Sequence, residues 1–207
     1  GSYLAELLLK KKYTIHALLR SKQKNKKNRF WRIKKIIKKI IFHKTSLIKY
    51  KKLSNLIKSI KPNEIYHLGS QGLDYKLTDN FFRTNPNIKG TQNILSIIKQ
   101  HTPKTKFYFA ASSEIFGKVK ISPQNENTKF DPRSAYAISK VAGFDLTRNY
   151  REAYNLHAST GILFNHESPR RGFEFVTRKI SLSVAKIKLG LQKNICLGNI
   201  NAKRDWG

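Results

Sequence analysis

Residues 106–114 read Lys106-Phe-Tyr-Phe-Ala-Ala-Ser-Ser-Glu114, and this stretch decides the fold. Its apolar run has the length of a buried strand and ends abruptly in two hydroxyls and a carboxylate. After an intervening loop, residues 134–154 show the apolar spacing of a helix. A buried strand that leads into a polar loop and a helix is typical of a parallel sheet, because parallel strands need crossover connections.

The same alternation continues along the chain in both directions. Short apolar segments predict strands at 13–19, 40–43, 64–69, 106–111, 156–164 and 194–197. Periodic segments predict helices at 2–11, 47–60, 88–101, 134–154 and 176–189. Pro62 and Pro103 follow two of these helices as stop signals. We therefore predict an α/β fold in which helices cover both faces of a parallel sheet.

The composition limits the class of protein. The chain has 207 residues with 39% hydrophobic content, enough for one domain with a sizeable core or for part of a larger protein. No apolar run has the length of a bilayer span, and no signal-peptide pattern opens the chain. Cys196 is the single cysteine and cannot form an intramolecular disulfide. We expect a cytoplasmic protein, and the absence of methionine leads us to expect a piece of a longer one.

The formal net charge of +30 raises the question of a polyanionic partner. Between Leu7 and Asn63 there is no acidic residue, and 22–42 has the pattern of a cationic amphipathic helix. Such a helix suits nucleic acid or an anionic membrane. A compositional bias toward Lys, Ile and Asn explains the segment equally, since the same residues are abundant elsewhere. The bias is the favoured interpretation, so we do not expect a nucleic-acid partner.

The polar residues after the decisive strand carry the chemistry. Ser112 and Glu114 follow the carboxyl end of a strand, where open α/β sheets bind ligands. Tyr136 and Lys140 are four residues apart on a predicted helix, so their side chains share one face. A nearby ammonium is expected to lower the pKa of the phenol, which is ordinarily about 10. Together these groups can oxidise a carbinol, remove a proton beside the new carbonyl and assist loss of water.

This set resembles the extended short-chain dehydrogenase/reductase family. Three further strings resemble the GDP-mannose 4,6-dehydratase family within it: Gly161-Ile-Leu-Phe-Asn-His-Glu-Ser-Pro-Arg-Arg-Gly172, Phe175-Val-Thr-Arg-Lys-Ile180, and Leu197-Gly-Asn199 with Ala202-Lys-Arg-Asp-Trp-Gly207. The resemblance implies a Rossmann-type doubly wound parallel sheet that binds NADP at 1–164, incomplete at its N-terminal side. It also implies the start of a smaller sugar-nucleotide-binding part at 165–207, incomplete at its C-terminal side.

The resemblance also implies roles for individual residues. The catalytic residues would be Ser112, where the family usually has threonine, with Glu114, Tyr136 and Lys140. The residues that contact the cofactor would be Gly1, Arg20, Leu68, Gly69, Gln71, Tyr136, Lys140, His166 and Arg171. Those that bind the sugar nucleotide would be Asn165, Lys179 and Arg204. No metal site is expected.

The implied activity is conversion of GDP-mannose to GDP-4-keto-6-deoxymannose, through internal hydride transfer by NADP and loss of water. This reaction is the first step toward GDP-fucose and related deoxyhexoses, and the resemblance implies a homodimer or homotetramer. We expect the 207 residues by themselves to be inactive. Two alternatives remain open: another nucleotide-sugar dehydratase or epimerase of the same family, and a catalytically inactive relative that binds polyanions.

Overall fold

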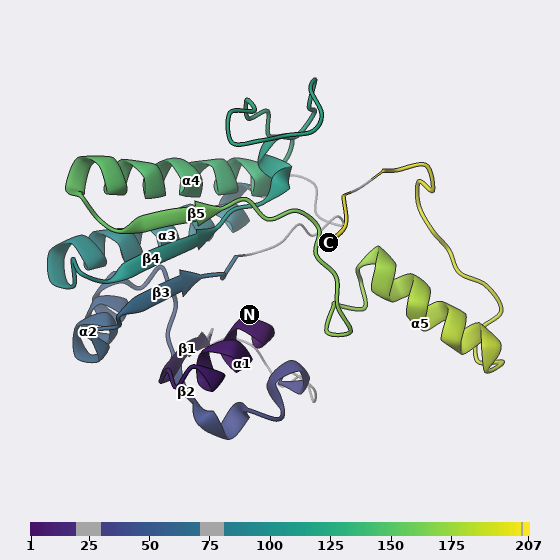
Figure 1. Ribbon diagram of the computed structural model, residues 1–207, viewed down its shortest axis with the longest axis horizontal. Helices are drawn as coiled ribbons and strands as arrows, with labels where there is room; N and C mark the ends of the chain where they lie inside the picture. The colour runs from purple at the N-terminus through teal and green to yellow at the C-terminus, as the bar shows by residue number, and fades with distance from the viewer. Residues whose placement is uncertain (20–29, 71–80, 204) are drawn as a thin grey trace. The chain divides into compact units, whose positions relative to one another are not determined.

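A computed structural model describes residues 1–19, 30–70, 81–203 and 205–207 (Figure 1). Contacts divide the chain into two compact units, Gly1–Ile162 and Leu163–Gly207, and each is described here by itself.

The first unit alternates helices with parallel strands. In chain order its elements are α1 (Ser2–Lys10), β1 (Ile15–Leu19), β2 (Ile40–Lys44), α2 (Tyr50–Ile60), β3 (Glu64–His67), α3 (Phe81–His101), β4 (Lys106–Ala110), α4 (Ala135–Tyr154) and β5 (Ala158–Gly161). The strands form two sheets, β1–β2 and β3–β4–β5, in which every pair is parallel. The predicted α/β class with parallel strands is confirmed.

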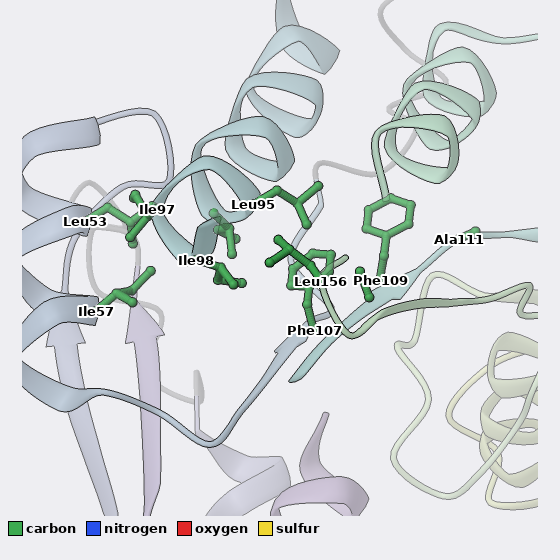
Figure 2. Close-up of a cluster of buried hydrophobic side chains, with 11 residues drawn as sticks. Leu53, Ile57, Leu95, Ile97, Ile98, Phe107, Phe109, Ala111 and Leu156 are labelled. Atoms are coloured by element: carbon green, nitrogen blue, oxygen red, sulfur yellow. The ribbon is translucent and has the colours of Figure 1, made fainter. Parts of the chain in front are cut away.

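The core lies between the three-stranded sheet and helices α2, α3 and α4 (Figure 2). Phe107 and Phe109 of β4 both point into it, because side chains two apart on a strand share a face. Leu95, Ile97 and Ile98 of α3 are completely buried in the same cluster. Each such side chain contributes about 1.5–3 kcal/mol relative to an exposed one. This packing holds β4 and α4, which carry the candidate site.

Helix α4 has clear boundaries. Its N-cap residue, Ser134, accepts a hydrogen bond from the backbone N–H of Ala137 at 3.1 Å. Asn155 ends it in the left-handed conformation at φ 52°. In the middle of the helix, Gly143 lies against the ring of Phe109. The absence of a side chain at this position lets α4 lie close to β4.

Two expectations from the sequence are wrong in the described residues. The cationic segment is not a continuous helix after residue 30: it forms the 3-10 turns Trp31–Ile33 and Ile37–Lys39 and then β2. The last residues of the segment are extended because they pair with β1 as part of β2. Phe30 packs on Phe42, with ring centroids 5.4 Å apart. Residues 22–29 of that segment lie outside the described ranges. The predicted strand at 194–197 is also absent from the described chain, and its Cys196 carbonyl accepts a hydrogen bond from the Lys179 ammonium instead.

The second unit contains one helix, α5 (Val176–Lys188), among the residues described there. The first and last residues of this unit meet in an isolated parallel bridge between Asn165 and Trp206. The Gly207 N–H donates to the Asn165 carbonyl at 2.8 Å, and the Glu167 N–H donates to the Gly207 carbonyl at 2.8 Å. These bonds join the residues after β5 to the last residues of the chain.

Candidate active site

The end of β4 places Ser112 and Glu114 on a short turn. Ser112 is the N-cap of the 3-10 turn Ser113–Ile115, and its Oγ accepts a hydrogen bond from the Glu114 N–H at 3.3 Å. Ile115 is completely buried and fixes the turn to the core. The side chain of Glu114 is exposed, so its carboxylate is available for a reaction partner.

Tyr136, in the first turn of α4, reaches back to this turn. Its phenol lies near the side chains of Ser112 and of Ser70, which follows β3. Burial raises the pKa of Tyr136, the two serine side chains lower it, and the nearby Glu114 charge raises it further. The net direction is upward. We expected this pKa to be lowered, and that expectation is wrong because burial has the largest effect on it.

Lys140 lies one turn further along α4 and is buried, with 3% of its surface exposed. Its Nζ donates to the carbonyl oxygen of Ala110, the last residue of β4, at 2.6 Å. The same atom lies 5.0 Å from the ring centroid of Phe109 and 5.6 Å from that of Tyr136. Burial lowers the pKa of Lys140 to about 8. The ammonium is therefore fixed beside the phenol by the strand that carries Ser112.

The residues suggested for the cofactor in the first unit come from two separate segments that meet. Gly1 precedes α1, and a Cβ placed on it would lie 3.6 Å from Leu68 Cδ1. Gly69 follows Leu68 and lies against Leu47 and His67. No side chain caps α1, and its first turn has no acidic residue, so its backbone N–H groups suit a phosphate. Arg20 and Gln71 lie outside the described residues.

The remaining suggested residues belong to the second unit. Asn165 is held in the bridge to Trp206. His166 Nδ1 lies 2.9 Å from the Phe164 carbonyl oxygen, and the His166 side chain is exposed. Arg171 forms an ion pair with Glu167 at 3.3 Å and lies 3.7 Å from the ring centroid of Phe175. Lys179 donates to the Cys196 carbonyl. Arg204 lies outside the described residues.

The sequence interpretation missed several residues that the structure places at the site. Ser70 lies near the phenol, and its signal was its position between Gly69 and Gln71, two residues suggested for the cofactor. Four buried polar residues are linked by hydrogen bonds to the backbone of Tyr136, and their spacing in the sequence does not predict this. They are His67, Asn87, Thr91 and Ser139.

The geometry assembles a hydroxyl, a phenol and an ammonium, with a carboxylate on the adjoining turn. Such a set can move a proton at a substrate hydroxyl and remove a second proton next to a carbonyl. Across the described part of the chain, no group of three or more His, Cys, Asp or Glu side chains could hold a metal ion. Within the same ranges no helix is long and apolar enough to cross a bilayer.

Comparison with solved structures identifies the same fold. A dTDP-glucose 4,6-dehydratase from Bacillus anthracis, solved with NAD, superposes with a TM-score of 0.73 at 20% identity, covering 92% of this chain and 58% of that one. A UDP-glucose 4-epimerase from Brucella ovis, also solved with NAD, superposes with a TM-score of 0.69 at 18% identity, covering 80% of this chain and 49% of that one. These similarities support the Rossmann-type α/β fold.

Comparison of sequences is more specific. The chain is 44% identical over 217 residues to the GDP-mannose 4,6 dehydratase of Cricetulus griseus, and 43% identical over 217 residues to that of Homo sapiens. It is 43% identical over 221 residues to GDP-mannose 4,6 dehydratase 2 of Caenorhabditis elegans. Each match covers 100% of this chain but only 56% to 58% of the relative. The family model for GDP-mannose 4,6 dehydratase matches residues 1–207. The chain therefore belongs to the GDP-mannose 4,6-dehydratase family.

Proposed function

We propose that the protein converts GDP-mannose to GDP-4-keto-6-deoxymannose with NADP as cofactor. The observation that carries the proposal is the placement of the Tyr136 phenol near Ser112, beside the Lys140 ammonium and next to the turn of Glu114. Family membership supports the assignment of this arrangement to a dehydratase site rather than to a generic hydroxyl site. The product, a 4-keto-6-deoxy sugar nucleotide, would lead to GDP-fucose and related deoxyhexoses.

Tyr136 is the group that moves the proton at sugar O4. The side chains of Ser112 and Ser70 oppose the effect of burial and stabilise the phenolate. Ser112 can hold O4 at hydrogen-bond distance while Tyr136 Oη accepts its proton. Bound NADP would take up the hydride from C4 and return it to C6. Lys140 contributes a fixed positive charge on the side of the phenol that faces β4.

Glu114 is the base for the second proton. The 4-keto group acidifies the C5–H bond, and a positioned carboxylate contributes roughly 10²- to 10⁴-fold in rate as a general base. Its exposed side chain on a turn that Ile115 anchors is suited to this step. The proton that Glu114 takes from C5 can pass to the C6 hydroxyl, which then leaves as water, and C5 regains a proton in exchange for the one that Tyr136 took from O4.

We assign the remaining residues to binding. For NADP we propose Gly1, Arg20, Leu68, Gly69, Gln71, His166 and Arg171 together with Tyr136 and Lys140. The uncapped N-terminus of α1 beside Leu68 supports this assignment in the first unit. For the sugar nucleotide we propose Asn165, Lys179 and Arg204, since cationic side chains neutralise a diphosphate. We propose a homodimer or homotetramer as the working form.

The test is incubation of the full-length gene product with GDP-mannose and catalytic NADP⁺, followed by mass spectrometry of the sugar nucleotide. We expect loss of one water per molecule without net accumulation of NADPH. Glu114→Gln should lower this rate by about 10²-fold or more. Glu126→Gln, at another exposed carboxylate, is the matched control and should leave the rate unchanged. A folded protein that epimerises the sugar and retains the water would contradict the proposal.

A further inference from the structure

Four buried polar side chains behind Tyr136 have no role in the proposed reaction. His67 is 5% exposed, Asn87 7%, Thr91 1% and Ser139 1%. They come from three elements, the end of β3, helix α3 and the second turn of α4. Burying a polar group costs free energy unless a hydrogen bond satisfies it. Hydrogen bonds link these four residues to one another, so they form one connected network.

The directions of the hydrogen bonds follow from the hydroxyl groups. The Ser139 hydroxyl donates to the Tyr136 carbonyl oxygen at 2.7 Å, so its oxygen is left to accept from Asn87 Nδ2 at 3.2 Å. The Thr91 hydroxyl donates to the backbone carbonyl oxygen of Asn87 at 2.8 Å, so its oxygen accepts from His67 Nε2 at 3.0 Å. Each hydroxyl has only one hydrogen, and His67 must therefore carry its proton on Nε2.

The surroundings keep His67 in this neutral form. Its ring centroid lies 5.6 Å from that of Phe109, and the Lys140 ammonium lies 5.0 Å from the centroid of the same ring. Burial first, and then the Lys140 charge, lower the pKa of His67 to about 4. A neutral imidazole beside a buried ammonium avoids the repulsion of two like charges.

We propose that His67 is a positioning residue that acts through Thr91, Asn87 and Ser139 to hold the first turn of α4 and so to orient the phenol of Tyr136. The inference rests on the proposed function, in which this phenol moves the proton at sugar O4. The network ends on the backbone carbonyl of Tyr136 itself, so a change anywhere along it is transmitted to the residue that must meet the substrate. A misplacement of about 1 Å at a reacting group can cost about 10²-fold in rate.

The experiment compares three variants of the full-length protein. Thr91→Val keeps the shape of the side chain but removes its hydroxyl, which breaks the link between His67 and Asn87. Thr91→Ser restores the hydroxyl. Thr147→Val is the matched control, because Thr147 is completely buried on α4 and its hydroxyl donates to the Gly143 carbonyl at 2.7 Å, the same four-residue geometry as Thr91 to Asn87.

We expect Thr91→Val to lower kcat for water loss on the order of tenfold with KM for GDP-mannose unchanged. Thr91→Ser should recover most of that rate. Thr147→Val should lower the melting temperature about as much as Thr91→Val does, but it should leave kcat near the wild-type value. Equal losses of kcat in the two valine variants would mean that only folding is affected and would overturn the positioning role, as would a wild-type kcat in Thr91→Val.

A second measurement does not depend on turnover and separates this inference from the proposed function. Nitrogen-15 NMR of the histidine rings should show His67, identified by its loss in His67→Gln, with its proton on Nε2 at neutral pH. In Thr91→Val this ring should lose that fixed tautomer. If the wild-type protein fails to process GDP-mannose but shows this NMR pattern, the function is wrong and the network stands. A proton on Nδ1 in the wild type would overturn the network.

Discussion

Replacing Gly143 by alanine tests how closely α4 must approach β4. A Cβ added to Gly143 would lie 2.2 Å from Phe109 Cζ, 2.7 Å from Cε1 and 2.9 Å from Cε2. Carbon atoms make favourable contacts at about 3.5–4.0 Å, so the ring must move by more than about 1 Å. Phe109 is only 3% exposed and is already packed against His67 and Lys140, so it has little room to do so.

The expected magnitude follows from two opposing effects. Overpacking a filled core costs about 1–3 kcal/mol, and these short contacts place Gly143→Ala near the upper end of that range. Alanine is favoured over glycine inside a helix by about 1 kcal/mol. The free energy of unfolding should therefore fall by about 2 kcal/mol in Gly143→Ala. The shift of α4 away from Ala110 should also lengthen the hydrogen bond of Lys140 and lower kcat.

Urea and thermal unfolding of the full-length protein, followed by circular dichroism, measure the change. Gly198→Ala is the control, since a Cβ there meets no atom within 4 Å. Phe109→Leu removes the three ring atoms that clash, so the double variant Phe109→Leu/Gly143→Ala should show a much smaller additional cost from the alanine than Gly143→Ala alone. If Gly143→Ala is as stable as the wild type, or if Phe109→Leu does not relieve its cost, the reasoning is refuted.

Three further changes test other parts of the first unit. Because the pKa of His67 is lowered to about 4 from 6.5, the unfolded chain binds more protons between these pH values; the free energy of unfolding should fall as pH drops through this window, and urea titrations of His67→Gln should show a shallower fall. Leu95→Ala removes a completely buried side chain and should cost about 2–5 kcal/mol in the same assay, whereas a cost below about 1 kcal/mol would contradict the core as described. Ser134→Ala removes the cap of α4 and should cost about 1 kcal/mol, with faster hydrogen exchange at the Ala137 N–H; unchanged exchange there would argue against the cap.

Local patterns predicted the strands and helices that build the site. The run at 107–111 predicted β4, because apolar residues followed by polar ones mark the end of a buried strand. The start of α3 was placed too late, at 88 rather than Phe81, because Pro86 lacks the N–H that a helix interior needs and so reads as a helix boundary. The cationic segment was predicted wrongly for a different reason. A short periodic pattern fits a helix as well as it fits turns followed by a strand, and here the pairing with β1 decides for the strand.

The placement of Tyr136 beside Lys140 was predictable from the sequence, but the electrostatics of the pair were not. Spacing placed Tyr136 and Lys140 on one face of α4, yet the direction of the pKa shift at Tyr136 depends on burial, which spacing does not give. The contact of His67 with Thr91 joins residues 24 positions apart on different elements. Only the three-dimensional packing of β3 on α3 brings such a pair together, so no local motif could have revealed it.

The distribution of the proposed catalytic groups between a core helix and an exposed turn has an evolutionary consequence. Lys140 is buried and Tyr136 is half-buried on a helix packed against the core, where most substitutions carry a cost in stability, whereas Glu114 is exposed on a three-residue turn. Exposed positions accept substitution at little cost to stability. Selection could therefore change the elimination step while the step that oxidises the alcohol stays intact.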